Sequence, residues 1–256
     1  MGERDVEHEW HEWQRRRWRA VSAPYGTAAL RHTHWLTTHP TEFAGAPGRW
    51  RLQSGAVVGD SLPNGDSPRL APGDELEFDV VRLRAFERDG SLALRIIDPD
   101  APSRTSLDGI EVYRFSPERI VTGRFTPAAV GATLDITSVD GHASSGVLGG
   151  TIALEIDGVP VSLTVTRDSN GLSAVLADAT SGDESYRFRF LRVAEPDADG
   201  AVVVDFNRAY LPPCAFSDEY VCPLPPPGNR WPVALRAGER LAVRHPHADL
   251  SSEAAA

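Results

Sequence analysis

A proline-rich stretch near the C-terminal end, residues 205–239, constrains what this chain can fold into more than any other feature. Six prolines lie between positions 212 and 227, and both cysteines, Cys214 and Cys222, lie among them. Proline fixes φ and has no N–H to donate, so this stretch can be neither a helix nor a central strand. Its aromatic residues between 210 and 231 supply apolar groups to bury. Long loops without secondary structure are usually either functional or disordered, and the aromatic residues lead us to predict an ordered one.

Short strand-like segments fill most of the sequence before this loop. From residue 50 to residue 193 they are rich in β-branched and aromatic residues, they often alternate, and glycine, proline and aspartate separate them. Residues 76–83 read as one strand, and Asp157–Gly158 predicts a tight hairpin. A second hairpin is expected between residues 186–193 and 201–206. The expected fold is mainly β, an antiparallel β-sandwich or barrel-like fold.

The N-terminal residues predict an amphipathic helix from residue 4 to about residue 21. Trp10, Trp13, Trp18 and Val21 fall near one helical face, and most charged side chains fall elsewhere. We expect the tryptophans to dock this helix onto a sheet. The expected organisation is a helix and packing segment over residues 1–48, a β-domain over 49–247 that includes loop 205–239, and a disordered tail over 248–256.

Composition excludes several kinds of function. The chain contains no lysine, which excludes a Schiff-base lysine, a cofactor-anchoring lysine and a Walker-type phosphate loop. The net charge of −10 argues against nucleic acid and anionic membranes as partners. No signal peptide, membrane-spanning stretch or cofactor motif is visible. We expect a cytoplasmic protein that uses no cofactor, and the sequence leaves its oligomeric state open.

Several motifs in the C-terminal third resemble one bacterial family. They are DATSGDESY at 178–186, DFNRAY at 205–210, PCA at 213–215, CPLPP at 222–226, NR at 229–230 and AGE at 237–239. Upstream, HWL at 34–36, PGRW at 47–50, Arg95, Asp98, Pro99 and Arg104 are similar to the N-terminal segment of the same family. Together they resemble the family known as domain of unknown function 1684, over most of the chain. The resemblance implies no particular reaction.

The family-like positions and their neighbours supply side chains that catalysts and binding sites use. The candidates for catalysis are Asp178, Tyr186, Asp205, Asn207, Tyr210 and Cys214. The candidates for ligand binding are His34, Trp35, Arg104, Arg189, Arg230 and Glu239. If loops 178–186 and 205–239 lie at the same end of the β-structure, many of these side chains converge on one mouth.

Assigned roles follow from the chemistry of acid–base catalysis. Asp178 or Asp205 would be the base, and Tyr186 or Tyr210 would be the acid. Asn207 and Arg230 would orient the substrate or stabilise an oxyanion.

Each candidate also has a structural interpretation. Asp178 suits an Asx-type turn, and Asn207 suits a tie to the backbone of the loop. Arg230 with Glu239 would form one internal ion pair, and Asp205 with Arg208 would form another.

The cysteines and histidines allow three interpretations. Cys214 and Cys222 are structural thiols or a disulfide, or Cys214 is a nucleophile with His34 as its base. In the third interpretation the cysteines bind a metal with His34, or with His245 and His247. His32 and His34 in a strand over residues 30–36 could also share a metal, with His39 near them.

These observations lead to one hypothesis and two alternatives. The hypothesis is a protein that binds a small organic molecule in a pocket capped by loop 205–239, as a cofactor-independent enzyme if it is one. Its reaction would be a hydrolysis, an isomerisation or a cyclisation by acid–base chemistry. The alternatives are a non-catalytic binding or structural module and a metal-binding protein that uses His34, Cys214 and Cys222.

Overall fold

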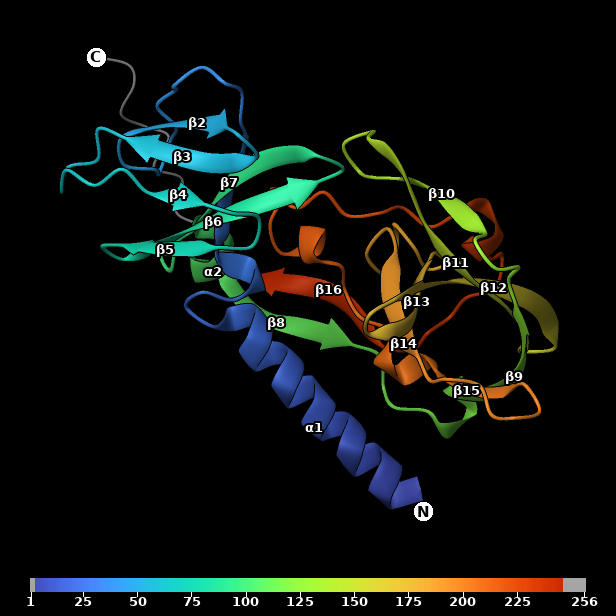
Figure 1. Ribbon diagram of the computed structural model, residues 1–256. Helices are drawn as coiled ribbons and strands as arrows, with labels where there is room; N and C mark the ends of the chain where they lie inside the picture. Colours follow the sequence, from blue (N-terminus) through green and yellow to red (C-terminus); the bar gives the residue numbers. More distant parts are fainter. Residues whose placement is uncertain (1–2, 246–256) are drawn as a thin grey trace. The chain divides into compact units, whose positions relative to one another are not determined.

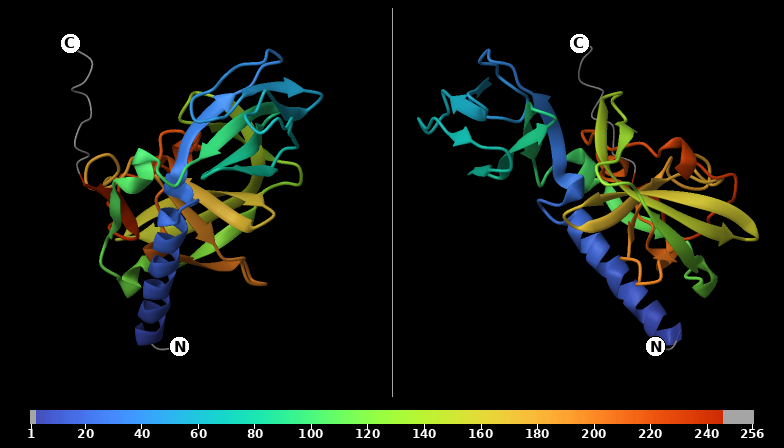
Figure 2. Two further views of the ribbon diagram at one scale, coloured as in Figure 1. Left: turned by 90° about the vertical axis from the view of Figure 1, so that its left-hand side faces the viewer. Right: turned by 45° about the vertical axis from the view of Figure 1, so that its right-hand side comes forward.

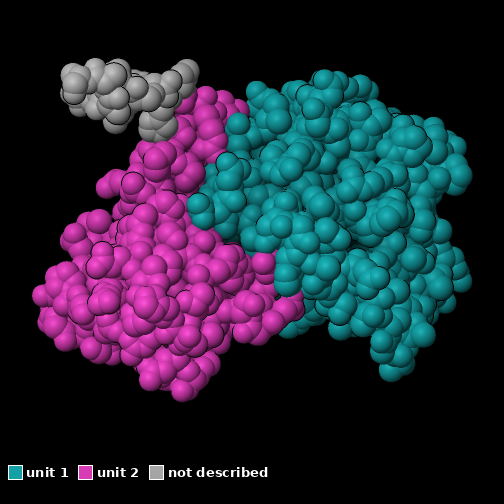
Figure 3. Space-filling model, turned by 90° about the horizontal axis from the view of Figure 1, so that it is seen from above, with its two compact units in different colours: residues 1–18, 110–242 teal, residues 19–109, 243–256 magenta. Residues whose placement is uncertain are grey.

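The computed structural model describes residues 3–245 and is mainly β, with antiparallel sheets and an N-terminal helix (Figure 1). The chain forms two compact units, which Figure 3 distinguishes by colour. Unit 1 comprises residues 1–18 and 110–242, and unit 2 comprises residues 19–109 and 243–256. The expected organisation, with boundaries after residues 48 and 247, stays a prediction. The tail expected to be disordered, 248–256, lies outside the described residues.

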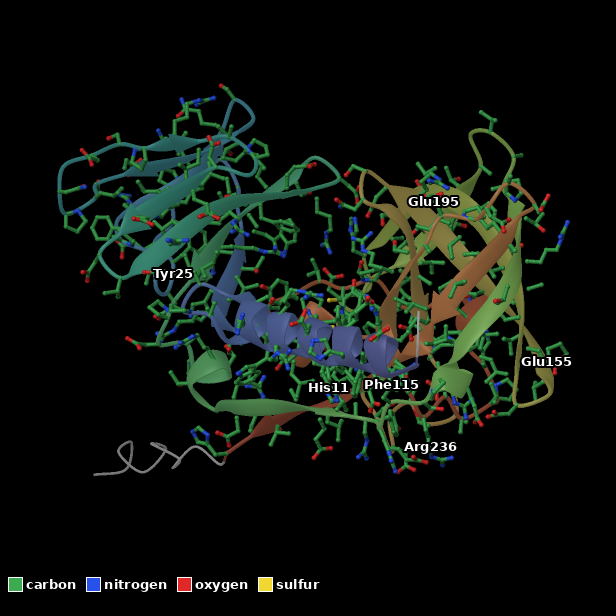
Figure 4. The ribbon with its side chains drawn as sticks, turned by 90° about the horizontal axis from the view of Figure 1, so that it is seen from below. His11, Tyr25, Phe115, Glu155, Glu195 and Arg236 are labelled. Atoms are coloured by element: carbon green, nitrogen blue, oxygen red, sulfur yellow. The ribbon has the colours of Figure 1, made fainter. Side chains whose placement is uncertain are left out.

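Helix α1 spans Glu3–Ser22, which confirms the predicted amphipathic helix. Trp10 is 4% exposed, and its Nε1 donates to the backbone oxygen of Asn207 at 2.8 Å. Its ring lies 5.4 Å from that of Phe115, which Figure 4 labels beside the helix. Trp10 therefore docks α1 onto the beginning of loop 205–239. Among residues 3–245, no helix has the length and apolar character that crossing a bilayer requires.

Unit 2 contains two small antiparallel sheets. One has the strand order β1-β7-β6-β5 and the other has the order β2-β3-β4. Their bounds are β1 Leu30–Trp35, β2 Arg49–Gln53, β3 Ala56–Asp60, β4 Arg69–Leu70, β5 Glu75–Phe78, β6 Val81–Arg88 and β7 Ser91–Ile97. Trp50, Leu83, Leu94 and Ile96 are fully buried in its core. The short helix α2, Pro102–Thr105, follows β7.

Unit 1 is built on one seven-stranded sheet that curves into a half-barrel (Figure 2). The order is β14-β13-β12-β11-β9-β15, and β10 pairs with β11. The strands are β9 Ile120–Pro127, β10 Thr133–Thr137, β11 Ala143–Ile156, β12 Val159–Asp168, β13 Gly171–Leu176, β14 Arg189–Val193 and β15 Ala201–Asp205. Its main core contains Ile152, Leu163, Leu191 and Val204.

The long strand β11 bends at a bulge between Leu148 and Gly150. Before the bulge β11 pairs with β10, and after it the same edge pairs with β9. Gly150 has φ +150°, and a Cβ there would lie 2.3 Å from the oxygen of Thr126. A glycine is therefore required where the sheet changes direction.

The hairpin at Asp157–Gly158 is confirmed. Ile156 pairs with Val159, and the two turn residues have φ of 51° and 77°, the signature of a tight turn between twisted strands.

Two other strand predictions were wrong. Residues 76–83 form the end of β5 and the beginning of β6, because Asp79 at φ 55° turns the chain and sets Leu76 opposite Leu83. β14 and β15 do not form a hairpin, because β14 pairs with β13 while β15 pairs with β9. The half-barrel places these neighbours in sequence at opposite ends of the strand order.

Loop 205–239 is ordered, as its prolines and aromatic residues predicted. Three short 3₁₀ turns, Phe206–Arg208, Pro213–Ala215 and Pro227–Asn229, punctuate it. After it comes β16, Glu239–Arg244, which the sequence did not predict and which pairs with β8, Leu107–Val112.

Candidate functional site

A pocket of about 320 Å³ lies in unit 1, on the face of the sheet opposite the main core. Leu163 and Val165 of β12 belong to the core, whereas their neighbours Thr164 and Thr166 line the pocket. Successive residues of a strand point to opposite faces of the sheet. The small polar residues that alternate with core residues in β12 and β13 therefore face the pocket. We call this cavity the loop pocket. It is lined by Leu134, Asp135, Ile136, Thr164, Thr166, Asp168, Ser173, Ala174, Val175, Phe190, Arg192, Tyr210, Pro213, Pro223, Leu224, Pro226 and Asn229.

Loop 205–239 forms one wall of the loop pocket, and its hydrogen bonds to the sheet and its connections include those of Tyr210, Leu224 and Asn229. The backbones of Tyr210 and Phe190 exchange two hydrogen bonds of 2.8 Å. The backbone N–H of Leu224 donates to the oxygen of Thr137 at 2.8 Å. Asn229, fully buried, accepts at 2.7 Å from the N–H of Thr164 and donates to the oxygens of Thr164 and Val175 at 2.8 and 2.9 Å. The prolines are thus held over the sheet by hydrogen bonds from the residues between them.

The walls of the loop pocket are mostly apolar, and its charged groups are partly exposed. Asp168 and Arg192 form an ion pair at 3.2 Å, and each side chain is 47% exposed. The N–H of Asn170, and next Arg192, hold the pKa of Asp168 below its usual value. Thr166 Oγ1 and Ser173 Oγ lie 3.2 Å apart. This arrangement suits a small apolar molecule with a polar end.

Asp178 lies in a buried ion pair with Arg189, and both side chains are completely enclosed. Their closest atoms are 2.5 Å apart, and Arg189 also donates to the backbone oxygens of Leu235 and Ala237. Asp178 accepts from the N–H groups of Thr180 and Leu235 at 2.9 and 3.0 Å. The pair therefore fixes the end of loop 205–239, and the Asx-type turn expected at Asp178 is present.

Glu239 is 1% exposed and joins α1 to the loop. It accepts from Nε and Nη2 of Arg17 at 2.9 and 3.0 Å, and from the N–H of Leu211 at 2.7 Å. The predicted ion pair between Glu239 and Arg230 was wrong, because Arg17 occupies the carboxylate. Sequence reasoning missed Arg17, whose only signal was its place among the helix arginines.

Asn207 and Asp205 secure the start of the loop. Asn207 exchanges hydrogen bonds of 3.0 and 2.9 Å with the backbone of Ser116, and its Nδ2 donates to Asp205 at 3.0 Å. Asp205 also pairs with Arg208 at 3.1 Å, as expected. The geometry at these positions favours the structural interpretation over the catalytic one.

Cys214 and Cys222 are both buried as thiols, with no disulfide between them. The N–H of Cys214 donates to Sγ of Cys222 at 3.3 Å. The Tyr186 hydroxyl lies 3.0 Å from the backbone oxygen of Cys214 and 3.6 Å from its Sγ. Nη2 of Arg187 donates to that hydroxyl at 3.2 Å. This is a compact group of thiols, phenol and guanidinium beside the loop pocket.

The groups in this cluster have shifted pKa values. The hydrogen bond from Cys222, followed by that from Tyr186 and the charge of Arg187, lowers the pKa of Cys214 to about 7. Burial raises the pKa of Tyr186 to about 12, so its hydroxyl is a donor at neutral pH. Arg187 was not among the predicted site residues.

Three predicted ligand-binding residues, His34, Trp35 and Arg104, belong to unit 2. The ring of His34 stacks on Phe43, and its Nε2 lies 2.9 Å from the oxygen of Ala44. The guanidinium of Arg88 lies over the ring of Trp35, 4.6 Å from the ring centre. Arg104 donates to backbone oxygens of residues 22, 23 and 99. Their role in binding stays a prediction.

Arg230 is exposed and lines a shallow depression with Asp178, Arg187 and Trp231. Among residues 3–245, no three His, Cys, Asp or Glu side chains are grouped so that they could hold a metal ion. Of the predicted catalytic residues, only Tyr210 lines the loop pocket. Sequence reasoning missed most of the other lining residues. The pattern that could have indicated them is the row of polar residues that alternates with core residues in β12 and β13.

Comparison with known proteins agrees with the motifs. The model of a family of proteins of unknown function, DUF1684, matches residues 105–240, more than half of the chain. The chain belongs to this family. A solution NMR structure of an uncharacterized protein from Haloarcula marismortui is 31% identical, with a TM-score of 0.44, and the match covers 54% of this chain and 79% of that one. No match was found among curated proteins.

Proposed function

We propose that unit 1 binds a small, largely apolar organic molecule in the loop pocket. The observation that carries this proposal is a cavity of about 320 Å³ between strand faces and loop prolines. Ligand pockets of roughly 300–1,000 Å³ with mainly apolar walls and a few polar groups are typical of small-molecule sites. Asp168, Arg192 and the hydroxyls of Thr166 and Ser173 would fix the polar end of the ligand.

Binding is better supported than acid–base catalysis by the predicted residues. A catalytic base must reach the proton that it removes. Asp178 is enclosed by Arg189, and Asp205 is engaged by Asn207 and Arg208. Tyr210 lines the loop pocket, whereas the carboxylates of Asp178 and Asp205 hold the loop.

The net charge of the chain favours a small molecule over a nucleic acid as the partner. A net charge of −10 disfavours nucleic acid, whose binding depends on cationic contacts with phosphates. A cytoplasmic location stays a prediction from the sequence.

The proposal is tested by ligand-observed NMR with a panel of monocyclic and bicyclic aromatic compounds, each with one hydroxyl or carboxyl group. Saturation transfer from the protein is expected for some members of the panel. Ser173→Trp, which places an indole in the loop pocket, should abolish that transfer. The matched control is Val203→Trp, at a 52% exposed position of β15, and it should keep the transfer.

Two results would contradict the proposal. One is equal transfer in the Ser173→Trp and Val203→Trp proteins, with both folded by circular dichroism. The other is the absence of transfer for the whole panel with the unmodified protein.

A further inference from the structure

The two thiols of loop 205–239 lie together without being bonded. Only residues 215–221 separate them, and the loop folds back so that the N–H of Cys214 reaches Sγ of Cys222 at 3.3 Å. This contact places the two cysteines close enough that rotation of their side chains can bring the sulfurs together as a disulfide.

The surroundings of the two sulfurs are unequal. Cys214 has the Tyr186 hydroxyl 3.6 Å from its Sγ, and Arg187 donates to that hydroxyl. Both groups favour a negative sulfur, because one donates a hydrogen bond and the other carries a positive charge. Sγ of Cys222 accepts from the backbone N–H of Cys214. The phenol and the guanidinium therefore mark Cys214 as the attacking thiolate and leave Cys222 as its partner thiol.

We propose that Cys214 and Cys222 form a peroxide-reactive dithiol site, in which Cys214 is the reacting thiolate and Cys222 is the resolving thiol. The oxidant class is a small hydroperoxide, with hydrogen peroxide as the simplest member. This site is additional to the loop pocket and does not depend on what the pocket binds.

The chemistry balances in two steps. The Cys214 thiolate attacks one peroxide oxygen, the O–O bond breaks, and the products are a sulfenic acid and hydroxide, which takes up a proton to become water. The Cys222 thiol then attacks the sulfenic sulfur, an S–S bond forms, the S–O bond breaks, and the hydroxide that leaves takes up the thiol proton to become a second water. Both sulfurs are oxidised and one peroxide is reduced. A dithiol such as dithiothreitol reverses the change by exchange.

The site adjoins the loop pocket. Cys214 and Cys222 pack in a buried cluster with Val175, Phe190 and Leu224, which also line the pocket. Their direct neighbours in sequence, Pro213 and Pro223, line it as well. A disulfide would therefore join two parts of the pocket wall covalently.

The test begins with the reduced full chain, treated with hydrogen peroxide at pH 7 and then alkylated under denaturing conditions. We expect neither thiol to be alkylated and the intact mass to fall by two hydrogens. Peptide mapping should find Cys214 joined to Cys222. The reaction should be roughly tenfold faster than oxidation of the same thiols in the denatured chain, because more of Cys214 is thiolate. Dithiothreitol should restore both thiols.

Two single variants test the assignment of roles. In Cys222→Ser, dimedone should trap a sulfenic acid at Cys214, because no resolving thiol remains. In Cys214→Ser, Cys222 should react no faster than a cysteine of the denatured chain. Circular dichroism establishes whether each variant is folded. If a variant does not fold, the oxidation of the unmodified chain still tests the proposal.

Three outcomes would overturn the proposal. The native thiols could oxidise no faster than those of the denatured chain. Cys214 could proceed to sulfinic acid without a disulfide to Cys222. Cys222 in Cys214→Ser could also be trapped as quickly as Cys214 in Cys222→Ser.

Discussion

Loop 205–239 contacts the rest of unit 1 in two regions that use polar side chains differently. At its ends, Asp178, Asn207 and Glu239 are buried and each accepts or donates several hydrogen bonds. At the loop pocket, the charged pair of Asp168 and Arg192 is half-exposed, and the walls are mostly apolar. The buried polar groups at the ends hold the loop together with Asn229, and the loop pocket that we propose as a binding site lies between the ends. The difference shows that the family motifs describe how the loop is built, while the pocket depends largely on residues outside them.

The largest expected effect is that of Asp178→Ala, which leaves the enclosed guanidinium of Arg189 without its charge partner. Breaking a buried ion pair on one side costs about 3–5 kcal/mol, and we expect a loss of that size in the free energy of unfolding from urea titration. The matched control is Asp168→Ala, whose pair with Arg192 is 47% exposed on both sides. It should cost at most about 1 kcal/mol. Similar losses in the two variants would remove the distinction between the two regions.

A smaller effect is expected for Asn229→Ala. The change leaves the N–H and oxygen of Thr164 and the oxygen of Val175 without the partner that Asn229 provides. Unsatisfied buried groups of this kind should lower the free energy of unfolding by about 2–4 kcal/mol. Asn170→Ala, at an exposed position in the turn between β12 and β13, should change it by less than about 0.5 kcal/mol. Equal unfolding midpoints would contradict the role of Asn229 as an anchor.

The smallest effect on stability concerns the pH dependence of Cys214. Its pKa is lowered to about 7 in the folded chain, below the roughly 8.5 of a free cysteine. Folding therefore favours the thiolate, and its contribution to stability is lost as pH falls through 7 and is complete above about 8.5. The ultraviolet absorbance of thiolate should rise with a midpoint near pH 7, and Cys222→Ala, which removes the side-chain hydrogen bond to Cys214, should raise that midpoint. A midpoint near 8.5 in the native protein would contradict the described environment.

The sequence predicted the helix, the hairpin at Asp157–Gly158 and the ordered proline-rich loop, because each depends on local backbone chemistry. It did not predict the turn at Asp79, since the apolar residues around it read as one strand. The partners of β14 and β15 depend on the curvature of the half-barrel, which no local pattern contains. The pairing of Glu239 with Arg17 joins positions that are 222 residues apart. The location of the pocket likewise depends on which face of β12 and β13 the loop covers.

The central claim is that loop 205–239 covers a binding pocket on the face of the half-barrel opposite its main core. The most direct measurement is the pattern of intermolecular NOEs between a bound aromatic compound and a methyl-labelled chain. We predict NOEs to methyl groups of Leu134, Ile136, Val175 and Leu224, which line the loop pocket. NOEs confined to exposed methyl groups such as those of Val147 and Val203 would contradict the claim.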